Sequence, residues 1–222
     1  FKQKTAYEIR LSLVGSEMCI RDRLFMNDAT PFQRRPILQT VSRFILRLFG
    51  WKIAAEFPAS SQYIVIFAPH TSNWDFPIGL LAAISVGFWP HWIGKSSLFK
   101  PPFGGLMRWL EGIPVDRSAH HNFVEQVVAM FKQQPSLVIA MTPEGTRSRT
   151  EHWKTGFYHI ARGAQVPIVF SYLDFKRKIG AIGPTFMPTG DINADLALIR
   201  EFYSGITGKH PERHGEIKLR AT

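Results

Sequence analysis

Short apolar runs alternate with segments of helical periodicity along most of this chain, and this alternation constrains the fold more than any other feature. Runs rich in β-branched and aromatic residues predict buried strands at residues 63–67, 91–94, 137–141 and 166–173. Helical patterns predict helices at residues 76–88, 122–131, 155–163 and 190–202, the last with Asp191 as its N-cap. Strands alternating with helices indicate an α/β domain with a mixed, largely parallel sheet flanked by helices.

An amphipathic helix is predicted ahead of these elements, over residues 36–55. Its apolar positions recur at helical spacing, while Arg43 and Arg47 fall on another face. A basic helix with Trp51 near its end suits a membrane interface, and packing against the core of its own domain is the alternative. Residues 76–94 carry no charge, but prolines near both ends and three glycines favour a buried helix and a short strand over a transmembrane span.

The charge of the chain indicates an anionic partner. Its 222 residues carry a formal net charge of +10, which suits nucleic acid, an anionic membrane or a phosphorylated substrate. No basic stripe with interleaved aromatic residues occurs, so nucleic acid is not expected. The single cysteine, Cys19, excludes disulfides and cysteine-ligated metal sites. His120 and His121 have no carboxylate or cysteine at a zinc-like spacing, and no metal site is expected.

The first residues are set apart from the rest. The stretch KQKTAYEIRLSLVGSEMCIRD, residues 2–22, resembles a string found at the ends of unrelated translated assemblies in which sequencing adapter was read as coding sequence. We therefore interpret residues 1–25 as a non-native or disordered extension, with Met26 as the native start and Cys19 outside the protein. A short native arm is the alternative.

The stretch APHTSNWDFP, residues 68–77, follows a predicted buried strand and contains a histidine and an aspartate five positions apart. Such positions are out of phase on one helix, so His70 and Asp75 meet only if His70 lies on a loop and Asp75 on the first turn of the next helix. The carboxylate would then hold one ring nitrogen and leave the other to accept a proton. No G-x-S-x-G motif occurs, so a nucleophile would come from the substrate. Two ordinary polar loop residues are the alternative.

Three cations follow three separate apolar segments: Lys95, Arg117 and Arg147. Cations that follow several strands can meet at one edge of a sheet and bind a phosphate group, although each alone is more often a surface charge. Gly145 allows a tight turn whose backbone N–H groups can bind an anion. Glu144, at a predicted strand end, can orient a loop or contact a substrate hydroxyl.

The order and spacing of these pieces resemble the glycerophospholipid acyltransferase family, which includes the bacterial 1-acylglycerol-3-phosphate acyltransferases. The resemblance covers about residues 60–175 and rests on four ordered blocks. They are His70 with Asp75 (H-x-x-x-x-D), Gly112 with Arg117, Glu144-Gly145-Thr146-Arg147 (E-G-T-R) and Val166-Pro167-Ile168 (V-P-I).

The resemblance implies that His70 is a general base and that Asp75 holds its imidazole. Arg117 and Arg147 would bind the acceptor's phosphate with Lys95 assisting. Three neighbouring residues would shape that site: Glu144, Gly145 and Thr146. The reaction would move a fatty acyl group from a thioester, acyl-CoA or acyl carrier protein, to a hydroxyl of a lysophospholipid such as 1-acylglycerol-3-phosphate, with no cofactor and no metal.

The same resemblance implies membrane lipid as a partner and a peripheral location on the cytoplasmic face of a bacterial inner membrane. Residues 26–56 would then be a membrane-associating helix, and residues 57–222 the acyltransferase domain. Three positions depart from the family pattern: Pro69, Pro114 and Thr142. They leave another lysophospholipid acceptor open. A phospholipid transacylase and a non-catalytic basic lipid-binding module are the rival interpretations.

Overall fold

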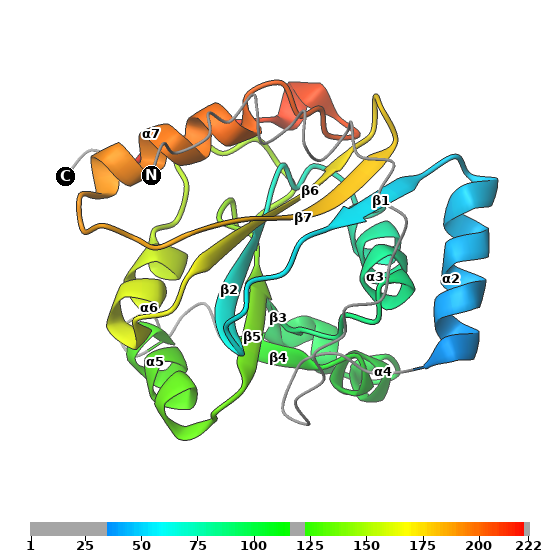
Figure 1. Cartoon of the computed structure of the whole chain (residues 1–222), viewed down its shortest axis with the longest axis horizontal. Helices are drawn as coiled ribbons and strands as arrows, with labels where there is room; N and C mark the ends of the chain where they lie inside the picture. The colour runs from blue at the N-terminus through cyan, green and yellow to red at the C-terminus, as the bar shows by residue number, and fades with distance from the viewer. Residues whose placement is uncertain (1–34, 116–122, 220–222) are drawn as a thin grey trace.

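The computed structural model describes residues 35–115 and 123–219. They form three layers, with a seven-stranded sheet in the middle and helices on both of its faces (Figure 1). The strands are β1 (Lys52–Ala55), β2 (Gln62–Phe67), β3 (His91–Lys95), β4 (Gly112–Val115), β5 (Leu137–Met141), β6 (Ile168–Asp174) and β7 (Ile179–Phe186). Their order in the sheet is β1-β7-β6-β2-β5-β3-β4. β6 and β7 pair antiparallel, and the other neighbouring strands pair parallel. The predicted mixed, largely parallel α/β sheet is therefore confirmed.

Helices cover both faces of this sheet. They are α2 (Pro36–Leu48), α3 (Asp75–Ser85), α4 (Gly104–Trp109), α5 (Phe123–Gln133), α6 (Gly156–Ala164) and α7 (Ile192–Tyr203), with short 3₁₀ turns at Ser96–Phe99 and Pro211–Arg213. α5, α6 and α7 pack on one face in the largest apolar cluster. α3 packs on the other face, with α2 and α4 against it. Arg43 of α2 donates to the Ser85 carbonyl at the end of α3, at 2.8 Å.

The predicted helix over 36–55 is too long. α2 ends at Leu48, and residues 52–55 form β1, which pairs with β7. The helix stops because Gly50 adopts φ +77° and two backbone bonds close the last turn: Gly50 donates to Arg47, and Trp51 donates to Leu46. This pair of bonds is the Schellman pattern, which favours glycine at the left-handed position. The sheet thus begins at Lys52, ahead of residue 57, where the catalytic domain was predicted to start.

The other predicted strands and helices are present, with small shifts at their ends, whereas the predicted extension at residues 1–25 and the first residues of the predicted 26–56 helix lie outside the described residues. β5 has the predicted bounds, and α7 begins after Asp191, whose carboxylate accepts from the N–H groups of Asn193 and Ala194 at 3.0 and 3.1 Å. β6 starts at Ile168, two residues late, because the Val166 N–H donates to Ala161 and closes α6 instead.

Besides β1, two further elements were not predicted, α4 and β7. Both carry the residues that normally break such elements: paired glycines begin α4, and two glycines and a proline interrupt the apolar pattern of β7. Lys176, Arg177 and Lys178 lie in the turn of the hairpin between β6 and β7. Within the described ranges, no helix combines the length and the apolar character needed to cross a bilayer.

The end of β2 is held by a tyrosine from the opposite end of the chain. The Tyr203 hydroxyl, at the end of α7, lies 2.9 Å from the Ile66 carbonyl and 3.1 Å from the Ser171 carbonyl. The residue is fully buried, and burial raises the pKa of its hydroxyl well above the ordinary value. Tyr203 therefore joins α7 to the two central strands just before the loop that carries His70.

Replacing Tyr203 by Phe removes these contacts and leaves the packing of the ring unchanged. We expect the free energy of unfolding to fall by about 1–2 kcal/mol, the usual cost of a lost buried hydrogen bond. Urea denaturation followed by circular dichroism measures this change. An unchanged midpoint would show that the hydroxyl does not stabilise the end of β2.

Candidate active site

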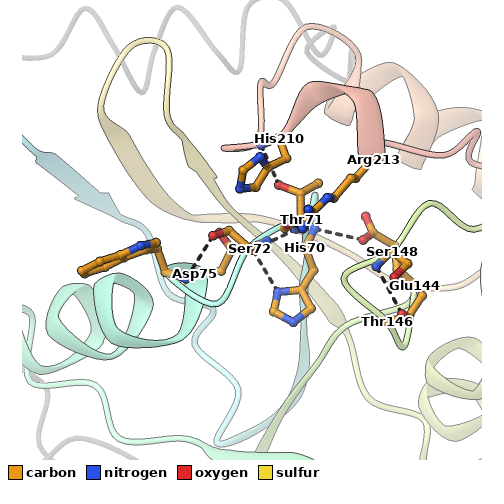
Figure 2. A network of polar contacts seen from close by, with 10 residues as sticks. His70, Thr71, Ser72, Asp75, Glu144, Thr146, Ser148, His210 and Arg213 are labelled. Carbon is orange, nitrogen blue, oxygen red and sulfur yellow. Dashed lines mark hydrogen bonds and ion pairs between the residues drawn. The ribbon is translucent and has the colours of Figure 1, made fainter.

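The candidate site lies where the parallel strands end. His70 comes three residues after β2, and Glu144 comes three residues after β5, the neighbouring strand. Carboxyl ends of parallel strands meet at one edge of a sheet, and ligands bind there in open α/β folds. Figure 2 shows His70 and Glu144 on the loops at this edge and Asp75 at the start of the helix that follows.

His70 and Asp75 meet as the sequence predicts. His70 lies on the loop, and Asp75 is the first residue of α3. His70 Nδ1 lies 3.1 Å from Asp75 Oδ2, a close approach without the alignment of a hydrogen bond. The Asp75 side chain is 1% exposed, and the imidazole is 15% exposed. The aspartate is thus fixed behind the ring, while the ring remains accessible from the open side.

Backbone amides hold the Asp75 carboxylate in position. The N–H groups of Thr71 and Ser72 both donate to Oδ2, each at 2.9 Å. These donors belong to the loop between His70 and the helix, so the carboxylate fixes the loop as well as facing the ring. The N–H of Trp74 donates to the Ser72 hydroxyl at 3.2 Å and tightens the same turn.

Glu144 supports the loop from the other side. Its Oε2 accepts the backbone N–H of His70 at 3.0 Å, and the residue is buried. The sequence left two roles open for Glu144, and this contact favours orientation of the loop. Three successive amides, from His70 to Ser72, therefore each donate to a buried carboxylate. Asp75 Oδ1 and Glu144 Oε1 have no partner among the residues that the structure describes.

Burial changes the titration of Glu144. The pKa of its carboxyl is raised from 4.5 to about 7: burial is the main cause, the His70 N–H opposes the rise, and the nearby Asp75 charge adds to it. The side chain therefore titrates in the neutral range, unlike an exposed glutamate.

The E-G-T-R stretch turns sharply after β5. Gly145 has φ +64°, and its N–H donates to the Thr142 carbonyl at 3.1 Å. An added Cβ at this position would meet the Lys154 side chain at 3.0 Å, so both the backbone conformation and the close packing favour glycine. Thr146 and Arg147 are exposed on the outer side of the turn.

An open depression of about 590 Å³ lies between the loops that follow β2, β5 and α7 and is lined mainly by polar and charged residues; His70, Asp75 and Glu144 are not among its lining residues. We call it the cationic depression. Its lining comes from three segments: Ser72, Asn73 and Trp74 after β2, Thr146, Arg147 and Ser148 after β5, and Lys209, His210 and Arg213 after α7. The volume is within the range of small-molecule sites.

The last of these segments was not identified from the sequence. Lys209, His210 and Arg213 follow α7 in a loop rich in glycine, proline and charge, which reads as an ordinary solvated surface. Only the fold brings them to this edge, where the His210 N–H donates to Thr71 Oγ1 and Arg213 Nη1 donates to the Thr71 carbonyl, at 3.2 and 3.3 Å. The basic composition of the loop was the one available signal.

Two other predicted site residues remain, Lys95 and Arg117. Lys95 is the exposed last residue of β3 and does not line the cationic depression. Arg117 lies outside the described residues, as do His120 and His121. Of the V-P-I block, which was not assigned to the site, Ile168 is the first residue of β6 and lies in the main core. The described residues contain no group of three or more histidine, cysteine, aspartate or glutamate side chains that could hold a metal ion.

The raised pKa of Glu144 makes a contribution to stability that depends on pH. The folded state retains the proton up to about pH 7, whereas the unfolded chain loses it near 4.5. Between these values the folded state binds more protons, so wild-type stability falls as pH rises, by up to about 1.4 kcal/mol per pH unit. Glu144→Gln lacks this titration. We expect the unfolding free energy of the wild type minus that of Glu144→Gln to fall between about pH 5 and pH 7.

Urea melts of both proteins at several pH values measure this difference. Other groups titrate equally in both proteins and cancel in the subtraction. A difference that stays flat across the range would contradict a buried, neutral Glu144.

Comparison with known proteins identifies the fold and the family. A family model described as Acyltransferase matches residues 52–172, more than half of the chain. The computed structure resembles the crystal structure of the 1-acyl-sn-glycerophosphate (LPA) acyltransferase PlsC from Thermotoga maritima. The TM-score is 0.55, the identity is 17%, and the match covers 77% of each chain.

Relatives in bacteria and in mammals are named as 1-acyl-sn-glycerol-3-phosphate acyltransferases. The 1-acyl-sn-glycerol-3-phosphate acyltransferase of Salmonella typhimurium is 36% identical over 132 residues, 55% of this chain and 52% of the relative. The Escherichia coli enzyme of that name is 35% identical over 133 residues, 55% of this chain and 52% of the relative. The human 1-acyl-sn-glycerol-3-phosphate acyltransferase alpha is 31% identical over 156 residues, 64% of this chain and 54% of the relative.

The chain thus spans about half the length of the curated relatives it matches. The matched region contains β1 to β5 and most of β6, together with His70, Asp75 and the E-G-T-R turn. From the family match and these relatives, the chain belongs to the glycerophospholipid acyltransferase family.

Proposed function

We propose that this protein transfers a fatty acyl group from an acyl thioester to the free hydroxyl of 1-acylglycerol-3-phosphate. The observation that carries the proposal is the contact between His70 and the buried Asp75, on a loop whose residues Ser72, Asn73 and Trp74 line the cationic depression. The names of the curated relatives support the same substrate class.

His70 acts as the general base. Nε2, the ring nitrogen that Asp75 does not contact, accepts the proton of the acceptor hydroxyl as its oxygen attacks the thioester carbon. The carbon–sulfur bond breaks, and the imidazolium returns the proton to the departing thiolate. Asp75 stabilises the imidazolium and fixes the ring, since its carboxylate is held by two backbone amides. The acyl group passes directly to the acceptor, so the enzyme needs no nucleophile of its own.

Arg147 binds the acceptor's phosphate. Its guanidinium is exposed at the cationic depression and can form two parallel hydrogen bonds with phosphate oxygens. Gly145 shapes the turn that presents it, and Glu144 positions the backbone of His70. Lys95 and Arg117 remain candidate phosphate ligands on the basis of the family pattern alone.

The proposed location is the surface of a membrane. α2 exposes a row of large apolar residues: Ile37, Val41, Phe44, Leu48 and Phe49. α4 and the segment before it add Phe103, Leu106 and Trp109. Arg35 joins the two, since its guanidinium lies 4.6 and 5.6 Å from the ring centroids of Trp89 and Trp109. We call this the α2–α4 surface. An exposed apolar surface of this kind suits insertion among lipid head groups.

The basic β6–β7 hairpin lies against one end of this surface. Lys178 Nζ donates to the Phe49 carbonyl at 3.0 Å, just after α2 (Figure 1). Neighbouring apolar and cationic groups together favour an anionic bilayer, because one set inserts and the other attracts lipid phosphates.

Replacing His70 by Ala removes the proposed base. We expect kcat for acyl transfer to 1-acylglycerol-3-phosphate to fall at least about 10²-fold, the usual scale for loss of a general base. Transfer of radiolabelled acyl groups from coenzyme A and carrier-protein thioesters measures it. His91→Ala is the matched control, since His91 Nδ1 lies 3.3 Å from Glu111 Oε2 at the start of β3. That histidine lies at the amino end of β3, whereas His70 follows the carboxyl end of β2.

The assay also separates the rival functions. Activity that His70→Ala retains would refute the mechanism. Transfer from a diacyl phospholipid and not from a thioester would identify a transacylase. Binding of anionic vesicles without transfer from any donor would favour a non-catalytic lipid-binding module.

Replacing Phe44 by Asp tests the proposed membrane surface. Phe44 is 67% exposed on α2, so the change should leave folding intact and reduce partition into anionic vesicles by about tenfold. Vesicle flotation measures the partition. Leu198→Asp, on the exposed side of α7, is the control and should bind like wild type. Equal loss in both variants, or no loss in either, would reject the α2–α4 surface as the membrane contact.

A further inference from the structure

We propose that Lys209 and Arg213, from the segment after α7, form a phosphate-binding subsite together with Arg147. The inference rests on the proposed function and extends it to residues outside the family match, which ends at residue 172. The ligand chemistry is a phosphate ester on a substrate of the acyl transfer.

The three cations line one depression from two unrelated parts of the chain. Arg147 follows β5, and Lys209 and Arg213 come from residues 205–219, which we call the C-terminal segment. Lys209 Nζ lies 4.8 Å from the centroid of the Trp74 ring, in the loop between His70 and Asp75. This contact places the ammonium group beside the catalytic loop without committing it to a carboxylate.

The C-terminal segment is anchored at both sides of the depression. Its Thr207 carbonyl accepts the Phe175 N–H at 2.9 Å, next to the end of β6, and its Lys218 carbonyl accepts the Trp153 N–H at 3.0 Å. Gly208 approaches Thr71 so closely that an added Cβ would lie 2.7 Å from Thr71 Oγ1. The segment is therefore fixed where it crosses the loop of His70, and its cations are held in place before any ligand arrives.

Thr71 connects this segment to the catalytic loop. Its side-chain oxygen accepts the His210 N–H, and its carbonyl accepts from Arg213 Nη1 (Figure 2). Its own N–H donates to Asp75. Thr71, which is buried, thus contacts both the proposed subsite and the carboxylate behind His70. Because Thr71 directly follows His70 in the chain, the subsite is attached to the residue next to the proposed base.

The charge of the depression suits a phosphate monoester. Among the described residues, one carboxylate forms an ion pair with these side chains: Glu212 Oε1 lies 4.0 Å from Arg213 Nε and 3.4 Å from His210 Nδ1. Three permanent cations against one carboxylate leave a net positive charge of about two, which balances a phosphate monoester at neutral pH. Lys209 and Arg147 have no ion pair among the described residues, so both charges remain available to a ligand.

Two substrates of the proposed reaction carry phosphate: the lysophospholipid acceptor and the nucleotide part of a coenzyme A donor. Isothermal titration calorimetry with glycerol 3-phosphate and with coenzyme A, each added to the full chain, distinguishes them. The variants are Lys209→Gln and Arg213→Gln. Lys218→Gln is the control, because Lys218 is an exposed lysine of the same segment that pairs with Glu216 at 2.9 Å, outside the depression.

We expect Lys209→Gln and Arg213→Gln each to weaken glycerol 3-phosphate binding about tenfold, the scale of one charge-assisted contact, with Lys218→Gln equal to wild type. Loss confined to coenzyme A would keep the subsite and assign it to the donor. Equal affinity of all four proteins for both probes would overturn the proposal, as would equal weakening by Lys218→Gln or no binding by the wild type. Lys209→Gln is the decisive variant, since its side chain makes no hydrogen bond within the described residues that folding needs.

Acyl transfer is measured separately in the same proteins. If the wild type binds glycerol 3-phosphate as expected but transfers no acyl group, the proposed function fails and the subsite stands. If the wild type transfers acyl groups and Lys209→Gln leaves both KM values and both affinities unchanged, the subsite fails and the proposed function stands.

Discussion

β2 is buried on both faces and paired on both sides, and the positions of the candidate functional groups depend on it. Tyr63 and Val65 face α3, while Ile64 and Ile66 face the helices of the main core. Parallel pairing with β5 and β6 aligns Ile66 with Met141 and with Phe170. Because of this alignment, the loops after β2 and β5 begin at neighbouring positions on the same edge of the sheet. His70 and Glu144, which are more than seventy residues apart in the chain, therefore lie side by side. A slip of one residue would turn every side chain of β2 to the wrong face.

The loop after β2 is held by charge rather than by packing. Backbone N–H groups have to be satisfied when they are buried, and here three in succession donate to the carboxylates of Glu144 and Asp75. Asp75 therefore contacts both the backbone and the imidazole, whereas Glu144 contacts the backbone of His70 alone. This explains in physical terms why an H-x-x-x-x-D block and an E-G-T-R block occur in one chain. The first presents the ring, and the second fixes the peptide from which the ring extends.

Sequence reasoning succeeded where the signal is local. The run at residues 63–67 predicts β2, and helical phase alone requires His70 on a loop and Asp75 on a first turn, as the structure has them. It failed where an element depends on a distant partner. β1 is four residues long and continues a helical pattern, and it becomes a strand only because β7 lies beside it. The Phe49-Gly50 pair was the one local sign that α2 ends before it.

The position of the C-terminal segment could not be predicted either. Its basic composition does not indicate that it packs against the loop after β2. Thr71 has a role in two networks, and neither is visible from its neighbours in sequence. The proposed base His70 and Asp75 come from six consecutive residues, whereas one part of the lining of the depression comes from a separate segment attached through Thr71. Chemistry and recognition are therefore encoded in separable parts of the chain. Exchange of the C-terminal segment between relatives would alter which head group is accepted and leave the proton transfer intact, so new specificity can evolve without rebuilding the catalytic pair.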